Sequence, residues 1–185
     1  MLDLFKRSLE SSPIIRKGDY DYFVHPITDG VPRMDPRVLA EVLDGFKEVG
    51  DFHCDLILAP EAMGLPIAVP LSLELGIPYS VVRKRRYGLP GEVSLSQVTG
   101  YSKGEMYIND VCQGDRVVLV DDVLSTGGTL RSIILALKGL GAELVDVIVA
   151  VEKGDHRPQL ERDLGVRIKT LVKVEVRDGR LVVLS

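Results

Sequence analysis

Short segments rich in valine, leucine and isoleucine alternate along the chain with segments whose apolar residues recur at spacings of three and four. This alternation predicts an α/β fold with a parallel sheet flanked by helices. The expected strands are residues 55–59, 79–82, 116–120 and 144–151. Their nearly continuous apolar character indicates burial on both faces. The expected helices are residues 36–49, 65–75 and 130–140, the last two followed by Gly76 and Gly141 at their C-termini.

The length of 185 residues fits one compact domain, and 45% hydrophobic with 27% charged residues is an ordinary globular composition. We therefore expect a single domain over residues 1–185. Residues 1–35 have weak periodicity and are expected to form a small cap over one edge. Residues 92–109 carry Gly100 and Gly104 among polar residues, which predicts a hairpin with a mobile tip. A second hairpin is expected in the tail, with its turn at Asp178 and Gly179.

Several functional classes are disfavoured by composition. No apolar run approaches the roughly 20 residues of a membrane span, and the N-terminus does not resemble a secretory signal, so we expect a soluble, cytoplasmic protein without membrane partners. Cys54 and Cys112 lack histidine neighbours at metal-ligand spacing, which argues against a zinc site or a disulfide framework. The net charge of −4 argues against binding to nucleic acid. The basic segment 83–86 therefore requires a different ligand or role.

The segment VVLVDDVLSTGGT, residues 117–129, places two acids before a loop rich in glycine and hydroxyl groups. Ligands of open α/β sheets bind beyond the carboxyl ends of the strands, where we expect Asp121 and Asp122, with Thr129 opening the next helix. The STGGT loop offers backbone N–H groups, hydroxyls and the positive end of a helix dipole. Such a loop suits a phosphate monoester.

The two acids need a different ligand, because carboxylates repel phosphate but accept hydrogen bonds from vicinal hydroxyls or hold Mg²⁺ through water. The loop lacks the lysine of a nucleoside-triphosphate P-loop, and the chain has no G-x-G-x-x-G segment for a dinucleotide. The two acids and the loop together therefore predict a binding site for a ribose 5-phosphate. The alternative is a solvated strand end followed by a simple turn before a helix.

The thirteen-residue segment closely resembles the phosphoribosyl-pyrophosphate (PRPP) signature of type I phosphoribosyltransferases. The resemblance covers nearly the whole chain and includes APEAMG at 59–64, VRKR at 82–85, LPGE at 89–92, GYSKGEMYI at 100–108 and VEKG at 151–154. The arrangement is similar to adenine and xanthine phosphoribosyltransferases. It is most like the archaeal hypoxanthine/guanine phosphoribosyltransferases, with FVHPITDGVP at 23–32 and YGLPGEV at 87–93.

The resemblance implies exchange of the pyrophosphate on ribose C1 for a purine nitrogen, with Mg²⁺ and in a homodimer. It assigns the ribose hydroxyls to Asp121 and Asp122. The residues assigned to the 5-phosphate are Ser125, Thr126, Gly127, Gly128 and Thr129. Those assigned to pyrophosphate are Glu61, Ala62, Met63, Gly64, Arg83 and Lys84. The alternatives are an ordinary strand-to-helix turn at 61–64 and a solvated charge run at 83–86.

The segment 99–106 resembles the mobile catalytic hood of the family, which closes over PRPP and keeps water from the cationic sugar. Tyr101, Lys103 and Glu105 are its expected working residues, and Lys103 could reach pyrophosphate in the neighbouring subunit. The alternative is an exposed loop without a catalytic role. Ser125 departs from hypoxanthine-guanine enzymes of the human type, which carry an acid at this position as their proposed general base. Proton removal from the purine would then use Glu105, water or a backbone group, or need little assistance.

Choice of the purine base is assigned to Lys153, which matches a lysine that meets O6 in 6-oxopurine enzymes. A cationic donor favours hypoxanthine, guanine or xanthine over adenine, whose 6-amino group itself donates. Phe23 and His25 are weaker candidates for stacking or edge contacts, and each of the three residues has a structural alternative. The resulting hypothesis is purine salvage that yields inosine or guanosine monophosphate. The alternatives are an adenine phosphoribosyltransferase and a non-catalytic PRPP-sensing regulator.

Overall fold

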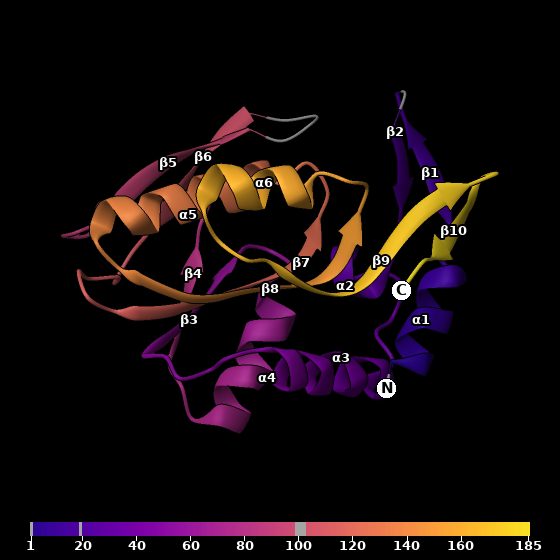
Figure 1. Cartoon of the computed structure of the whole chain (residues 1–185), viewed down its shortest axis with the longest axis horizontal. Coiled ribbons are helices and arrows are strands. Elements are labelled where there is room, and N and C mark those ends of the chain that lie inside the picture. Colours follow the sequence, from indigo (N-terminus) through magenta and orange to yellow (C-terminus); the bar gives the residue numbers. More distant parts are fainter. Residues whose placement is uncertain (1, 19, 99–102) are drawn as a thin grey trace.

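A six-stranded sheet with helices on both faces forms the body of the molecule (Figure 1). The computed structural model describes residues 2–18, 20–98 and 103–185. The helices are α1 (Asp3–Glu10), α2 (Pro26–Asp29), α3 (Pro36–Val49), α4 (Leu65–Leu75), α5 (Gly128–Leu140) and α6 (Arg157–Leu164). The strands are β1 (Ile14–Lys17), β2 (Tyr20–Phe23), β3 (Leu56–Pro60), β4 (Tyr79–Val82), β5 (Val93–Val98), β6 (Lys103–Ile108), β7 (Arg116–Leu124), β8 (Glu143–Lys153), β9 (Lys169–Arg177) and β10 (Arg180–Val183).

The strand order of the main sheet is β10-β9-β8-β7-β3-β4. All neighbours pair in parallel except β10, which closes the edge as an antiparallel hairpin with β9. This topology confirms the predicted fold class. From β3 the chain proceeds through α4 to β4, whereas from β7 it proceeds through α5 and α6 in the opposite direction along the sheet. The direction of winding therefore reverses between β3 and β7, and the carboxyl ends of such strands are where open α/β sheets bind ligands.

Two hydrophobic clusters, one on each face of the sheet, hold these layers together. Val118 and Val120 of β7 contribute to the cluster formed with α1, α3 and α4. Val117 and Leu119 contribute to the cluster formed with α5, α6 and the β5–β6 hairpin. Figure 1 shows the same layers, with α5 and α6 on one side of the sheet and α3 and α4 on the other. Because successive residues of a strand point to opposite faces, a strand between two clusters is apolar throughout.

The cap and the β5–β6 hairpin are not part of the six-stranded sheet but pack against it through the two clusters. Residues preceding α3 form α1, the β1–β2 hairpin and α2, as a small unit beside the sheet. The expected hairpin within 92–109 is present as β5 and β6, paired from Val93 with Ile108 to Val98 with Lys103. Its tip, residues 99–102, lies outside the described residues. Within the described residues, every helix is too short or too polar to cross a bilayer.

Some boundaries differ from the sequence prediction. The helices at 36–49 and 65–75 and the strand at 79–82 match α3, α4 and β4. In contrast, β7 continues four residues past Val120, and α5 begins at Gly128 rather than at Leu130. The sequence analysis did not predict α6, because Leu160 and Leu164 are its only buried residues and the rest of the helix is polar.

Candidate active site

The two acids of β7 are buried within the strand. Asp121 and Asp122 are 5% and 9% exposed, and the strand continues past them to Leu124. The predicted strand end at Val120 and the alternative of a solvated strand end are therefore wrong. Burial raises the pKa of Asp121 from 3.8 to about 6, and burial together with the neighbouring charge of Asp121 raises the pKa of Asp122.

The pair has a hydrogen bond of its own but no cationic partner in the part of the chain that the structure describes. The Asp122 N–H group donates to Asp121 Oδ1 over 2.9 Å. The ion pairs of the described residues involve other acids. Two buried carboxylates without a countercharge form a strong acceptor site for hydroxyl groups or for a hydrated cation.

The STGGT segment leads from β7 directly into the N-terminus of α5. Gly127 precedes the helix with a φ of 77°, a left-handed conformation that favours glycine. A Cβ atom at this position would lie 2.7 Å from Leu160 Cδ2, so the loop packs closely on α6. The helix begins at Gly128, one residue before the predicted Thr129, and no side chain caps it. Its first N–H groups and the positive end of its dipole therefore suit an anion.

The cap contacts this loop through an aromatic residue that the sequence analysis did not single out. Tyr20 of β2 and Ser125 share a hydrogen bond of 3.0 Å between their hydroxyl oxygens. The alternation of YDYF in β2 places Tyr20 and Tyr22 on one face of the strand, which was the available signal. On the other side of the site, Gly30 follows α2 and lies against the Met63 side chain. The cap thus reaches both loops at the carboxyl edge of the sheet.

The turn at 61–64 and the basic segment after β4 are joined by Glu61. Its Oε2 lies 2.9 Å from Arg83 Nε, and its Oε1 accepts a hydrogen bond of 2.6 Å from the Lys84 N–H group. The Glu61 N–H group also donates to Val82 O over 3.0 Å. The structure therefore places the two segments predicted to bind pyrophosphate side by side.

Only part of the turn has backbone groups left for a ligand. The Gly64 N–H group donates to Pro60 O over 3.2 Å, and that of Glu61 is also used internally. In the part of the chain that the structure describes, the N–H groups of Ala62 and Met63 make no backbone hydrogen bond. The peptide between Glu61 and Ala62 is cis. The whole turn was expected to donate to the diphosphate. Among the described residues of the turn, the backbone N–H groups that are free to do so are those of Ala62 and Met63.

The predicted catalytic residues of the hairpin are described in part. Tyr101 lies outside the described residues, as does the side chain of Lys103, whose backbone lies in β6. Glu105 is exposed, and its carboxylate accepts a hydrogen bond from the Tyr107 hydroxyl, which raises the pKa of Tyr107. Tyr107 in turn forms two backbone hydrogen bonds with Arg83, of 2.9 and 2.7 Å. The base of the hairpin is thus fixed to the segment that carries Arg83.

Lys153, at the end of β8, reaches the cap. Its ammonium group donates a hydrogen bond to Asp21 O and lies 3.7 Å from the centroid of the Tyr20 ring. The Phe23 ring centroid is 5.9 Å away, and this side chain is 4% exposed. The structure therefore brings together Lys153 and Phe23, two residues predicted to contact the base, and adds Tyr20 to them.

His25 occupies a different position. Its Nδ1 accepts a hydrogen bond from the Ile27 N–H group at the start of α2, and its Nε2 lies 3.0 Å from Ser8 Oγ. The residue is 2% exposed, and burial lowers its pKa to about 4. Both ring nitrogens are engaged within the cap, so in this structure neither is free for the expected edge contact of His25 with a base. The residue instead fixes α2 against α1.

Comparison with protein families gives one match that covers most of the chain. Residues 39–177 match the family model described as the phosphoribosyl transferase domain. This range includes β3 to β9 with both loops at the carboxyl edge of the sheet.

Named relatives are similar over almost the whole length. The chain is 52% identical over 181 residues to the hypoxanthine/guanine phosphoribosyltransferase of Methanobacterium lacus, covering 98% of this chain and 95% of that protein. It is 52% identical over 185 residues to the enzyme of the same name from Methanohalophilus mahii, covering 100% and 97%. Among solved structures, an adenine phosphoribosyltransferase from Thermoanaerobacter pseudethanolicus has a TM-score of 0.77 at 27% identity, over 94% of this chain and 99% of that one.

Proposed function

This chain belongs to the phosphoribosyl transferase family, and we propose that it transfers the 5-phosphoribosyl group of PRPP to hypoxanthine or guanine in purine salvage. The products are inosine or guanosine monophosphate and pyrophosphate. The observation that carries this proposal is the 52% identity, over essentially the full chain, to relatives named for that activity. The chain is then a pentosyltransferase within the glycosyltransferase class.

The geometry around β7 supports PRPP as the sugar donor. In this proposal the segment 125–129 and the N-terminus of α5 hold the 5-phosphate, while Asp121 and Asp122 accept hydrogen bonds from the ribose hydroxyls. The buried acids are compatible with a phosphorylated sugar because they face its hydroxyls and the loop faces its phosphate. Hydrogen bonds from the ribose hydroxyls would offset the free-energy cost of burying these two carboxylates.

The leaving pyrophosphate is assigned to the N–H groups of Ala62 and Met63 and to the cations of Arg83 and Lys84. Glu61 fixes Arg83 at one end of this group through their ion pair. Negative charge grows on the pyrophosphate as the bond to ribose C1 breaks, and donors fixed in advance stabilise that charge without reorganisation. The sugar becomes similar to an oxocarbenium ion, so water must be kept away from it. We assign that exclusion to the β5–β6 hairpin with Tyr101, Lys103 and Glu105.

Recognition of the base is assigned to Lys153 with the aromatic ring of Tyr20, while Phe23 is 4% exposed and belongs to the hydrophobic core next to them. An ammonium group can donate to O6 of hypoxanthine or guanine, whereas the 6-amino group of adenine is a donor and would not be accepted. Ser125 offers no carboxylate to take the purine proton, and Glu105 of the hairpin is the candidate that the family resemblance suggests. Its carboxylate accepts a hydrogen bond from the Tyr107 hydroxyl.

Mg²⁺ is proposed as the cofactor, held mainly by PRPP. The described residues contain no cluster of three or more histidine, cysteine or acidic side chains that could hold a metal. The paired carboxylates of Asp121 and Asp122 nevertheless fit this ion, because Mg²⁺ prefers oxygen ligands and retains several waters. When bound, Mg²⁺ neutralises charge on the pyrophosphate.

We extend the proposal to a homodimer in the cytoplasm, as the family resemblance implies. Leu73 on α4 is 81% exposed and Tyr79 at the start of β4 is 41% exposed. Single exposed apolar side chains are common on monomers, so the family resemblance alone carries this part of the proposal. Sedimentation equilibrium measures this directly, and a strictly monomeric protein would contradict it.

The proposal is tested by incubating the protein with PRPP, Mg²⁺ and hypoxanthine and separating the products by chromatography. Inosine monophosphate and pyrophosphate should form in equal amounts. The alternative of a PRPP-sensing regulator predicts equilibrium binding of PRPP without turnover of any purine, and that result would overturn the proposed activity.

A further inference from the structure

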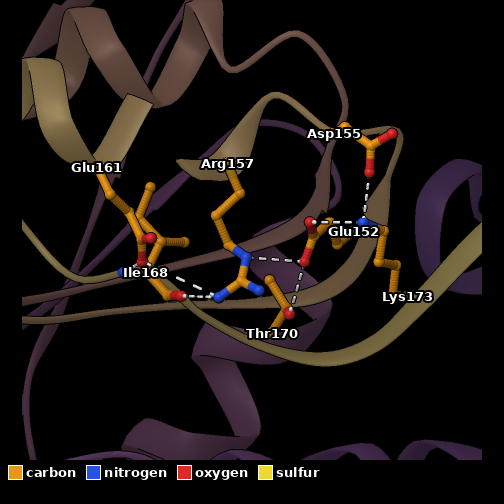
Figure 2. Close-up of polar contacts among 7 residues, drawn as sticks. All are labelled: Glu152, Asp155, Arg157, Glu161, Ile168, Thr170 and Lys173. Atoms are coloured by element: carbon orange, nitrogen blue, oxygen red, sulfur yellow. Dashed lines mark hydrogen bonds and ion pairs between the residues drawn. The ribbon is translucent and has the colours of Figure 1, made fainter. Parts of the chain in front are cut away.

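A buried carboxylate lies directly before Lys153 in β8. Glu152 is 2% exposed, and because adjacent residues of a strand point to opposite faces, it faces α6 and β9 whereas Lys153 reaches the cap. Its Oε2 lies 2.8 Å from Arg157 Nε and accepts a hydrogen bond of 3.1 Å from Thr170 Oγ1. Its Oε1 lies 3.7 Å from Lys173 Nζ. Figure 2 shows Glu152 between the side chains of Arg157 and Lys173.

The two cations tie down the turn that joins Lys153 to α6. Arg157 is the first residue of α6, and its Nη1 also donates to Ile168 O over 3.2 Å. Lys173 Nζ donates to Asp155 Oδ1, within the turn, over 2.5 Å. The turn is therefore held to β9 at Asp155 and to β8 at Arg157 (Figure 2).

Breaking the ion pair between Glu152 and Arg157 would cost free energy, because Glu152 is buried. Removing a carboxylate from water carries a large desolvation cost, which only a paired and hydrogen-bonded geometry offsets. Among the described residues only Thr170 donates a hydrogen bond to this carboxylate, and its Oε1 has none, so Glu152 depends on the charges of Arg157 and Lys173 to offset its burial. None of the steps assigned to PRPP or to the purine uses Glu152 or Arg157, which leaves their role as a pair to be explained.

We propose that Glu152 and Arg157 are positioning residues, which hold the end of β8 and the following turn so that the Lys153 ammonium group stays at the base site. The inference rests on the proposed function, because it takes Lys153 as the residue that meets the purine. Without the ion pair, the turn is released at its α6 end, and Lys153 leaves its place beside Asp21 O and the Tyr20 ring.

A matched pair of variants separates positioning from stability. Arg157→Gln removes the partner of Glu152 at the carboxyl end of β8. Lys169→Gln removes a similar ion pair, in which Lys169 Nζ lies 2.6 Å from Asp146 Oδ2. Asp146 is also a residue of β8, but it lies at the opposite end of the sheet from Glu152. Both cationic side chains are 34% exposed, and the acids are 2% and 5% exposed. The two variants should therefore lose similar stability.

Only Arg157→Gln should change the kinetics. We expect its KM for hypoxanthine to rise about tenfold, as for loss of a hydrogen bond to a charged group, with the KM for PRPP within about twofold of wild type. Lys169→Gln should leave both values unchanged. An unaltered KM for hypoxanthine in Arg157→Gln, or an equal rise for both substrates, would overturn the proposal. Glu152→Gln breaks the same ion pair without leaving a buried charge, and it gives the same test should Arg157→Gln fail to fold.

Two further measurements show whether the pair acts through Lys153. In a Lys153→Gln background, Arg157→Gln should raise the KM for hypoxanthine no further, and additive effects would contradict the proposal. Acylation of Lys153 by an N-hydroxysuccinimide ester, followed by mass spectrometry, should be faster in Arg157→Gln than in wild type or Lys169→Gln. This readout needs no turnover, so a wild type that forms no nucleotide would refute the proposed function, whereas unchanged acylation would refute the positioning.

Discussion

The Asp121 carboxyl group is expected to destabilise the protein at neutral pH in the absence of PRPP. Burial raises its pKa in the folded state from 3.8 to about 6. The folded protein then binds this proton more tightly than the unfolded chain, so stability falls as pH rises between these values and stays lower above them. The free energy of unfolding therefore falls by an amount on the order of a few kcal/mol as pH rises from below 4 to above 6.

Asp121→Asn removes this cost and keeps the oxygen that accepts from the Asp122 N–H group. Urea denaturation in EDTA should give a higher free energy of unfolding than wild type at pH 7.5, with a clearly smaller gain at pH 4.5, and removal of the Asp121 charge should also lower the raised pKa of Asp122. The same variant should bind PRPP more weakly, because an amide replaces a carboxylate acceptor for the ribose hydroxyls. A variant no more stable than wild type at pH 7.5, or a gain that is equal at both pH values, would refute the reasoning.

Asp55→Asn serves as a control of opposite sign. Hydrogen bonds from Arg116 lower the pKa of Asp55 to about 2, so this carboxylate contributes stability above its ordinary value of 3.8, and that contribution is lost as pH falls towards 2. Its replacement should lower stability at pH 7.5 and leave PRPP binding unchanged, since Asp55 lies at the opposite end of the sheet from the site.

Lys153→Gln should raise the KM for hypoxanthine about tenfold or more while the Kd for PRPP stays unchanged; equal catalytic efficiency in steady-state kinetics would remove Lys153 from the base site. Gly127→Ala should lower the Tm and raise the KM for PRPP, because its φ of 77° costs about 1 kcal/mol for a residue with a side chain and the added Cβ would meet Leu160 at 2.7 Å. A wild-type Tm in this variant, measured by calorimetry, would contradict that packing. Glu61→Gln should raise the KM for pyrophosphate about fivefold in the reverse reaction, because it releases Arg83. An unchanged KM would show that Glu61 does not contribute to pyrophosphate binding.

The pattern of burial made much of the fold predictable. Helices α3 and α4 and strand β4 match their predicted bounds, because one-sided and two-sided burial leave distinct apolar periods in the sequence. The same logic ended the strand at Val120, because Asp121 and Asp122 are polar, whereas β7 continues to Leu124. These acids are buried, and a site that binds hydroxyl groups explains why their desolvation is tolerated.

The site could be predicted only where its residues are neighbours in the sequence. The STGGT loop is continuous, so its relation to a helix N-terminus followed from local pattern alone. Contacts such as Tyr20 with Ser125 or Glu61 with Arg83 join distant segments and leave no periodic trace. The contact of His25 with Ser8 could not be predicted for the same reason, since Ser8 lies in α1, whose bounds the sequence does not indicate.

The central claim is that this chain transfers phosphoribose from PRPP to a 6-oxopurine. It is tested most directly by measuring kcat/KM for hypoxanthine, guanine, xanthine and adenine side by side, at saturating PRPP and Mg²⁺. The value for hypoxanthine or guanine should exceed that for adenine by at least about a hundredfold, because the ammonium group of Lys153 would face another donor on adenine. Adenine as the preferred base, or no turnover of any of the four, would contradict it.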